Sequence, residues 1–334
     1  MNSLSEIVSR GFGSSNVVVL GDPVADQFLS GTISRVSREA PVFILRHDET
    51  VTLPGAAANA AANVVALGGR VSLVGFIGDD TSGTELRRSL ESAGVDISGL
   101  VTSPSTTTTK VRVLAGQHYA ARQQVIRIDY EDAGTDDQKV REELKRRFAL
   151  AAVKADALII SDYGYGSVFS EVFEDARTIA DERSIPLIVD SRYRLAEFVG
   201  AATATPNREE VEQLLGKDFT TEQCSQLRER LGLTALLVTN GNQGMTLFEA
   251  GSAPQHLPAI GPTEPVDVTG AGDTVIAAYA LGLASGLSYL DAAMIANHAG
   301  GIVVMKNRTS TVSAAELLDS FVSNNIEASL GQAK

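Results

Sequence analysis

The chain has 334 residues and carries 28 lysine and arginine residues against 41 aspartate and glutamate residues, a formal net charge of −13. So acidic a protein repels a phosphate backbone, which argues against general nucleic-acid binding. With 44% hydrophobic and 21% charged residues, the composition is that of a globular protein, and it excludes disorder and collagen-like repeats.

Nothing in the sequence indicates secretion or membrane insertion. Residues 1–15 lack the apolar stretch of a signal peptide. The longest apolar stretch, 275–287, contains two glycines and is far shorter than the roughly 20 residues of a membrane span. The single cysteine, Cys224, excludes an intrachain disulfide and a Cys-rich zinc site. We therefore expect a cytoplasmic protein that binds neither membrane nor nucleic acid.

Short apolar runs alternate with longer helical patterns over most of the chain. Strands are expected at residues 17–20, 71–76, 157–161, 187–190, 235–239 and 245–249. Helices are expected at residues 56–67, 82–93, 137–153, 170–183, 208–215, 221–231, 274–285, 290–305 and 314–323. Most of these strands are continuously apolar, as in sheets buried on both faces. The alternation predicts an α/β fold with a doubly wound, mostly parallel sheet flanked by helices.

Two early stretches break this alternation. Residues 31–51 are rich in β-favouring side chains, and residues 106–130 contain two runs in which apolar and charged residues alternate. A period of two is typical of a sheet with one face in water. We expect these stretches to form a small β-sheet lid within a single domain that spans residues 1–334.

Residues 267–280, DVTGAGDTVIAAYA, form the most informative segment. A turn of Gly270, Ala271 and Gly272 leads into an apolar helix, and the first N–H groups of a helix are open to an anion. The turn fits a cradle for a phosphoryl group in transfer, and Asp273 fits the base that deprotonates the attacking hydroxyl. Taken alone, the pattern also fits an aspartate that only caps the helix.

The same segment resembles the C-terminal signature of the ribokinase-like (PfkB) carbohydrate kinases. The glycine-rich signature of that family has a counterpart at residues 53–61, its Asn-x-x-Glu element at 207–210, and its nucleotide-side strand and turn at 238–244. Order and spacing agree from about residue 16 to residue 323. The resemblance implies a ribokinase-like fold and a kinase that uses ATP and Mg²⁺, with Asp273 as the catalytic base.

The sugar-side segments of the chain resemble bacterial kinases of D-glycero-D-manno-heptose 7-phosphate, which make precursors of lipopolysaccharide heptose. These segments are residues 21–26, 34–42, 123–129, 161–164 and 308–313. The chain departs from those kinases in four places, one of them a few extra residues around 116–121 that lengthen the expected lid hairpin. Tyr165 replaces a lysine, Ser191-Arg192 replaces Pro-Lys, and Ala56-Ala57 replaces a pair led by glycine. The resemblance implies phosphorylation of the anomeric hydroxyl. Another sugar, sugar phosphate or nucleoside remains open as acceptor, as does a catalytically silent sugar- or nucleotide-binding relative.

The resemblance also implies a sugar site. Residues that follow strands or open helices are expected to contact the sugar, namely Asp26, Gly55 and Asn59. Three arginines are candidates for the phosphate of the substrate, because a guanidinium group matches phosphate bidentately; they are Arg35, Arg112 and Arg127. For each of them, a structural role as a cap or an ordinary salt bridge is the alternative.

A nucleotide and metal site is implied in the same way. The residues expected on the adenosine side are Thr239, Gly241, Gly244 and Asn297, with Asn207 facing the triphosphate. Asn207 and Glu210 lie one helical turn apart, so both are expected to organise Mg²⁺ through water. A solvated helix start is the alternative for this pair, and an ordinary buried polar residue is the alternative for Asn297.

Two expectations concern assembly. Active sites of open α/β sheets lie beyond the carboxyl ends of the strands, and Asp26, Asn207 and Asp273 each follow a predicted strand. The exposed edge of a small lid sheet often pairs with a second copy, so we expect a homodimer through the lid. In the heptose interpretation, nucleotidyl transfer is expected from a separate protein.

Overall fold

The computed structural model describes residues 2–117, 122–132, 134–262 and 264–331. The strands of its large sheet are β1 (Asn16–Gly21), β4 (Arg70–Gly78), β5 (Asp96–Ser103), β8 (Ala157–Asp162), β9 (Leu187–Ser191), β10 (Thr203–Ala204), β11 (Ala235–Thr239), β12 (Met245–Glu249) and β13 (Gln255–Leu257). Their order is β13-β12-β11-β10-β9-β8-β1-β4-β5. The pairs from β5 to β11 are parallel, whereas β12 and β13 are antiparallel at one edge.

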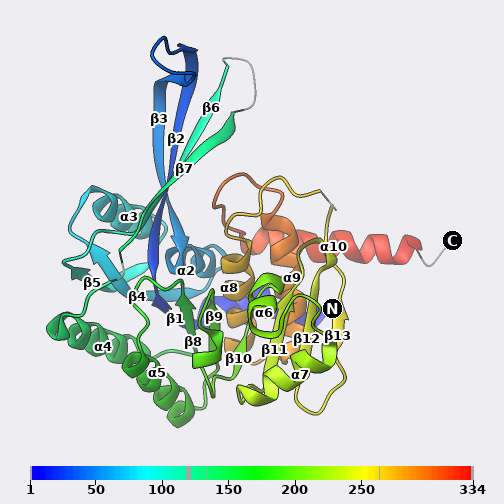
Figure 1. Ribbon diagram of the computed structural model, residues 1–334. Coiled ribbons are helices and arrows are strands. Elements are labelled where there is room, and N and C mark those ends of the chain that lie inside the picture. The colour runs from blue at the N-terminus through cyan, green and yellow to red at the C-terminus, as the bar shows by residue number, and fades with distance from the viewer. Residues whose placement is uncertain (1, 118–121, 133, 263, 332–334) are drawn as a thin grey trace.

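Helices cover both faces of this sheet (Figure 1). They are α1 (Asn2–Glu6), α2 (Ala57–Ala66), α3 (Thr81–Ser92), α4 (Gln138–Ala152), α5 (Ser170–Arg183), α6 (Arg208–Leu215), α7 (Thr221–Arg230), α8 (Ala271–Ala284), α9 (Tyr289–Val303) and α10 (Ala314–Gly331). One core holds α2, α3, α8 and α9 against the sheet, and the other holds α4, α5 and α7. The doubly wound, mostly parallel sheet flanked by helices that the sequence predicted is confirmed.

Strand β8 shows why continuous apolar runs predict this arrangement. All of its residues are buried. Ile159 faces the core beneath α2 and α8, whereas Leu158 and Ile160 face the core beneath α4 and α5. Burial of each such side chain contributes about 2 kcal/mol. Because both faces of the strand are covered, residues 157–160 are apolar, and polar residues, Ser161 and Asp162, occur only at its carboxyl end.

The small sheet consists of β2 (Pro23–Val36), β3 (Phe43–Ala56), β6 (Thr109–Gly116) and β7 (Gln123–Tyr130), in the order β3-β2-β6-β7. Strands β2 and β6 are parallel, and the other pairs are antiparallel. Figure 1 shows this sheet rising away from the large sheet as a long ribbon. Strands β2 and β3 extend beyond the expected range of 31–51, so Asp26 and Gly55 lie within the small sheet. Residues 118–121 of the expected lid lie outside the described residues.

Three strands of the large sheet were not expected from the sequence, and helix α8 begins earlier than expected. Strand β5 was missed because polar residues and Gly99 interrupt its apolar positions, and β10 and β13 have only two and three residues. Helix α8 begins at Ala271 rather than at residue 274, because Gly270 adopts a left-handed conformation (φ 78°) and serves as the N-cap. Asp273 therefore lies within the first helical turn.

Ala56, the N-cap of α2, adopts φ 52° and ψ −129°, a conformation that favours glycine. We expect Ala56→Gly to raise the free energy of unfolding by about 1 kcal/mol, because the backbone strain is relieved. Ala60→Gly, at a buried position inside the same helix, is the control and should lower it by about 1 kcal/mol. Urea unfolding measures both. A decrease in both variants would show that Ala56 stores no strain.

Candidate active site

Polar side chains gather at the carboxyl ends of the central parallel strands. Asp22 follows β1, Tyr163 follows β8, and Asp190 lies near the end of β9. Asn207 comes shortly after β10, and its backbone bridges to Thr239 at the end of β11. The start of α8 brings Asp273 to the same edge, where its carboxylate meets Tyr163. The fold thus brings these polar residues to the carboxyl edge of the sheet, where the site was expected.

Asp273 is held by two hydrogen bonds from different parts of the chain. Asn59 Nδ2 donates to Oδ2 at 2.8 Å, and the Tyr163 hydroxyl donates to Oδ1 at 3.0 Å. Only 3% of the residue is exposed. Burial outweighs the two hydrogen bonds and raises the pKa of the carboxyl to about 7. Its side chain caps no helix, so the capping alternative is excluded, and a carboxylate that titrates near neutrality suits a general base.

In the turn before Asp273, a side chain would clash at Gly270 but would meet open space at Gly272. A Cβ at Gly270 would lie 2.4 Å from Asn59 Nδ2, whereas a Cβ at Gly272 would meet nothing within 4 Å. Ala271 and Gly272 line a pocket described below. The Ala271 amide donates to the Val268 carbonyl, whereas the amides of Gly272 and Asp273 have no acceptor within the helix. The turn can therefore present N–H groups to an anion that lies beside Asp273.

Asn59, expected to contact sugar, is occupied by the protein on both sides of its amide. Its Nδ2 donates to Asp273, and its Oδ1 accepts from Asn63 Nδ2 at 3.1 Å. The Oδ1 of Asn63 in turn accepts from the Thr274 hydroxyl and the Val312 amide. Asn59 thus orients the carboxylate of Asp273, and a contact between Asn59 and the sugar stays a prediction.

Asp26 forms a buried ion pair with Arg112. Arg112 Nη1 lies 2.6 Å from Asp26 Oδ1, and the two side chains are only 11% and 6% exposed. Burial raises the pKa of Asp26, although Arg112 opposes the shift. A Cβ at Gly55 would lie 2.7 Å from Asp26 Oδ2, so Gly55 makes room for this carboxylate. The predicted grouping of Asp26, Gly55 and Arg112 is therefore present in the structure.

Four cations of the site differ in whether a carboxylate neutralises them. Arg112 is paired with Asp26, and Arg127 donates two hydrogen bonds to Asp129. Among the described residues, no ion pair joins Lys110 or Arg192 to a carboxylate. The Lys110 ammonium lies 5.6 Å from the Tyr163 ring centre, and burial lowers its pKa.

Arg35, the third predicted phosphate ligand, lies elsewhere. Arg112 pairs with Phe28 across β2 and β6. Arg35 is seven residues farther along β2, roughly 23 Å at the rise of a strand. It is exposed near the outer end of the small sheet. The structure therefore does not bring Arg35 together with Arg112 and Arg127.

An apolar pocket adjoins the N-terminus of α8, where Ala271 and Gly272 line it. Four of the residues expected around adenosine line it, namely Thr239, Gly241, Gly244 and Asn297. Asn297 is fixed by donating to the Pro258 carbonyl at 2.7 Å. A Cβ at Gly244 would lie 2.0 Å from the Leu257 carbonyl oxygen, so only glycine fits beneath this wall. The pocket has the shape and apolar character that suit a nucleotide base.

Asn207 and Glu210 form a capping box at the start of α6. Asn207 Oδ1 accepts from the Glu210 amide, and Glu210 Oε2 accepts from the Asn207 amide. Both residues thus stabilise the start of α6, as the alternative interpretation expected. Within the described part of the chain, Asn207 Nδ2 and Glu210 Oε1 have no hydrogen bond.

The charge of Arg192 only partly offsets the burial of the carboxylates around this helix start. Burial, followed by the charges of Glu210 and Asp273, raises the pKa of Asp190 well above its usual value. Burial also raises the pKa of Glu210. Within the described residues, no three His, Cys, Asp or Glu side chains could hold a metal ion. This arrangement fits Mg²⁺ that keeps waters and shares the phosphates of a nucleotide.

The roles of four residues at the site could not be assigned from the sequence. Lys110 and Tyr163 reach the surroundings of Asp273, Asp190 faces Glu210, and Asp22 binds backbone amides of the loop after β8. Period-two alternation places Lys110 on the face of Arg112, which was a usable signal. The contacts of the other three join segments that are far apart in the chain.

The comparisons with known proteins agree with this geometry. The family described as "pfkB family carbohydrate kinase" matches residues 25–316. The "Bifunctional protein HldE" of Caulobacter vibrioides is 38% identical over 316 residues, covering 92% of this chain and 64% of the relative. That of Shewanella amazonensis is 37% identical, covering 98% and 67%. The chain thus spans about two thirds of the length of these relatives.

Solved structures share the fold. Arabidopsis thaliana ribokinase superimposes with a TM-score of 0.68 at 22% identity, covering 92% of this chain and 98% of that one. Escherichia coli phosphofructokinase-2 gives a TM-score of 0.73 at 18% identity, with the same coverage. None of the described helices has the length and apolar character needed to cross a bilayer. Because the family match covers most of its length, the chain belongs to the pfkB family of carbohydrate kinases.

Proposed function

We propose that this carbohydrate kinase, which uses ATP with Mg²⁺, phosphorylates a sugar phosphate, namely D-glycero-D-manno-heptose 7-phosphate at its anomeric hydroxyl. One observation carries the proposal. Asp273 lies in the first turn of α8, directly after two residues that line the apolar pocket, and the charges of Lys110 and of Asp26, the partner of Arg112, act on its carboxyl. A nucleotide in the pocket would direct its γ-phosphate toward the turn before Asp273. A sugar near Asp26 would direct a hydroxyl toward the same carboxylate.

The residues of the chain have separate tasks in this reaction. Asp273 accepts the proton of the attacking hydroxyl, and the amides of the first turn of α8 stabilise charge on the transferring group. Asn207, Glu210 and Asp190 would hold Mg²⁺ through water, and the ion would neutralise the phosphates of the nucleotide. The small sheet acts as a lid that excludes water and limits wasteful ATP hydrolysis.

A phosphorylated sugar is supported by the two unpaired cations. The chain has a net charge of −13, so a dianionic substrate needs local positive charge. Arg112 and Arg127 are already neutralised by carboxylates. We therefore assign the phosphate of the substrate to Lys110 and Arg192, in place of the arginines expected from the sequence. The resemblance of the sugar-side segments to heptose 7-phosphate kinases and the identity to HldE proteins support the heptose.

Lys110→Met tests this assignment. We expect the KM for the sugar phosphate to rise about 10- to 100-fold, the effect of losing one charge-assisted hydrogen bond. The KM for ATP should stay unchanged. Lys139→Met, on an exposed turn of α4, is the control. An equal rise of both KM values, or no change in either, would contradict the assignment.

The acceptor itself is tested by measuring ADP release with a panel of sugars. The panel contains heptose 7-phosphate, fructose 6-phosphate, ribose and adenosine. We expect turnover with heptose 7-phosphate and little with the others. Preference for an unphosphorylated sugar or a nucleoside would overturn the heptose assignment, and a wild-type protein that turns over none of them would overturn the kinase reaction proposed here.

We further propose a homodimer formed through the small sheet, in the cytoplasm. All residues of the edge strand β7 are exposed. Its apolar side chains Val125, Ile126, Ile128 and Tyr130 are between 42% and 56% exposed. An unpaired strand edge with exposed apolar side chains suits pairing with a second copy. Sedimentation equilibrium should give twice the mass of the chain, and a monomer at micromolar concentration would contradict the dimer.

A further inference from the structure

Tyr163 contacts the catalytic carboxylate from the segment of residues 161–164, for which the resemblance assigned no individual role to Tyr163. The loop of Tyr163 begins directly after β8 and leads to α5. The Tyr163 hydroxyl donates to Asp273 Oδ1, while Asn59 donates to the other oxygen. Together the two donors fix the plane of the carboxylate. Without the hydroxyl, the carboxylate of Asp273 would be held on one side only.

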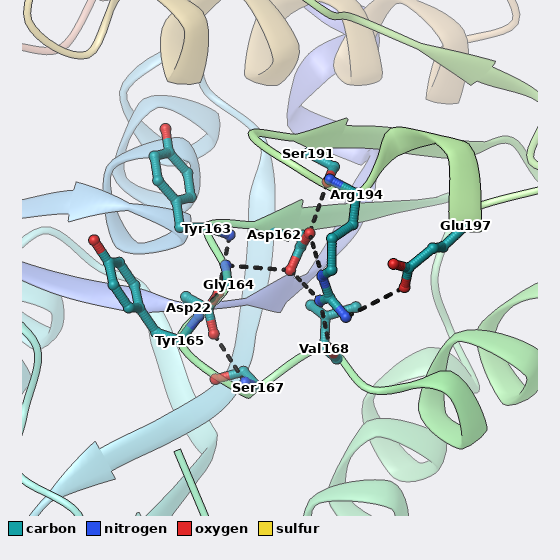
Figure 2. Close-up of polar contacts among 10 residues, drawn as sticks. All are labelled: Asp22, Asp162, Tyr163, Gly164, Tyr165, Ser167, Val168, Ser191, Arg194 and Glu197. Carbon is teal, nitrogen blue, oxygen red and sulfur yellow. Dashed lines mark hydrogen bonds and ion pairs between the residues drawn. The ribbon is translucent and has the colours of Figure 1, made fainter. Parts of the chain in front are cut away.

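The backbone that carries Tyr163 is pinned from below by Asp22, as Figure 2 shows. The Asp22 carboxylate accepts three amide hydrogen bonds, from Tyr163 at 2.9 Å, Tyr165 at 3.0 Å and Ser167 at 2.8 Å. Asp22 is only 1% exposed. A buried carboxylate that accepts from the amides of three alternate residues of the loop fixes the loop in one conformation.

A second buried carboxylate fixes the base of the same loop. Asp162 accepts hydrogen bonds from the Ser191 hydroxyl, from the Gly164 amide and from the Arg194 guanidinium. Arg194 also donates to the Val168 carbonyl at 2.8 Å. In Figure 2 both tyrosine rings of the loop point away from this cluster. The loop is therefore a rigid support from which Tyr163 reaches Asp273 and Tyr165 reaches Glu131.

The small sheet rests on the same support. Lys110 of β6 lies 5.6 Å from the ring centre of Tyr163 and 5.4 Å from that of Tyr165. The Tyr165 hydroxyl donates to Glu131, directly after β7, at 2.6 Å. The position of the small sheet is thus connected through Lys110 and the Tyr163 ring to the carboxylate of Asp273.

We propose that Tyr163 is a positioning residue for phosphoryl transfer, which holds Asp273 in its reactive orientation and connects it to the small sheet through Lys110. The inference rests on the proposed role of Asp273 as the base. Its hydrogen bond favours the ionised carboxylate, in a site where burial favours the protonated one. The charged groups that face Asp273 from other elements are Asp26 of β2, Lys110 of β6 and Asp190 of β9. Tyr163 supplies a neutral donor among them.

Tyr163→Phe tests the inference, with the sugar on which the wild type turns over fastest. We expect kcat to fall about 10-fold and the acid limb of kcat/KM to move to higher pH by about one pH unit, because the ionised carboxylate loses a donor. The KM for ATP should change less than twofold. Tyr165→Phe removes a hydroxyl two residues away and keeps its ring, so its acid limb should stay at the wild-type pH.

A double-mutant cycle separates this role from general damage to the loop. In an Asp273→Asn background, Tyr163→Phe should have no further effect on the residual kcat. A wild-type acid limb and kcat in Tyr163→Phe would overturn the inference. So would a full 10-fold loss in the Asp273→Asn background.

A measurement without turnover keeps the inference independent of the proposed substrate. The free energy of unfolding of the wild type should fall with rising pH until Asp273 is ionised, near pH 7. In Tyr163→Phe this fall should end about one pH unit higher, and in Tyr165→Phe it should not move. If the kinase proposal is wrong, the wild type shows no turnover. If this inference is wrong, the wild type and Tyr163→Phe have the same pH profile of stability.

Discussion

Asp273→Asn is expected to lower kcat about 1,000-fold, the loss that follows removal of a well-placed general base. The amide keeps the size of the side chain and can still meet the Tyr163 hydroxyl, so the fold and ATP binding should remain. Calorimetric titration with ATP measures binding, and ADP release measures turnover. Because Asp273 is 3% exposed and its pKa is raised to about 7, the base is ionised in a substantial fraction of molecules at neutral pH.

The same substitution should change the pH dependence of stability in a definite direction. The folded pKa lies above the ordinary value of 3.8, so the group contributes stability below about pH 4 that is lost as the pH rises through 7. Asp273→Asn lacks this titration. The free energy of unfolding of Asp273→Asn minus that of the wild type should therefore increase by about 2 kcal/mol from pH 5 to pH 7.

Glu209→Gln, an exposed carboxylate beside Glu210, is the control for both measurements. It should leave kcat and the pH profile of stability unchanged. An Asp273→Asn protein with more than a tenth of the wild-type kcat would show that another group takes the proton. A constant stability difference between pH 5 and pH 7 would show that the carboxylate is not buried in solution.

The main sheet could be predicted from the sequence because its determinants are local. Runs such as residues 157–160 are apolar without interruption, as is typical of a strand covered on both faces. The turn of Gly270 to Asp273 was equally readable, since a left-handed glycine, small residues and an apolar helix follow one another directly. Where local signals weaken, as in the two residues of β10, the prediction missed the strand.

The sequence predicted candidate residues of the site but not the contacts that hold them in place. The sequence pointed to Asp273 and to the residues around the apolar pocket, but not to what holds them. Asp22 meets the loop after β8 across more than 140 residues of sequence. No spacing rule predicts such a contact, because it arises from the order of β1 and β8 in the sheet.

The phosphate ligands show a second limit. Alternation along β6 and β7 placed Lys110, Arg112 and Arg127 on one face, as the register confirms. It could not say which cations the protein neutralises itself. Arg112 and Arg127 are paired with Asp26 and Asp129, whereas the unpaired charge belongs to Lys110. Charge pairing depends on side-chain packing across strands, and the sequence pattern carries no information about it.

Arg112→Met should lower the free energy of unfolding by about 3–5 kcal/mol at pH 7, because it leaves the charge of Asp26 buried without a partner. Arg112 Nη1 and Asp26 Oδ1 are 2.6 Å apart, and both side chains are almost fully buried. Methionine preserves most of the packing against Phe28, over whose ring the guanidinium lies. The loss is therefore electrostatic, and urea unfolding measures it.

The matched control is the double variant Asp26→Asn with Arg112→Met, which removes both charges. It should recover about half of the lost stability, since breaking a buried pair costs more than replacing it. Arg112→Met alone should also be less destabilised at pH 5 than at pH 7, because burial already raises the pKa of Asp26 and protonation then removes the unpaired charge. If the double variant is less stable than Arg112→Met, the two side chains stabilise the small sheet independently. The ion pair would then not be what holds Asp26 in place.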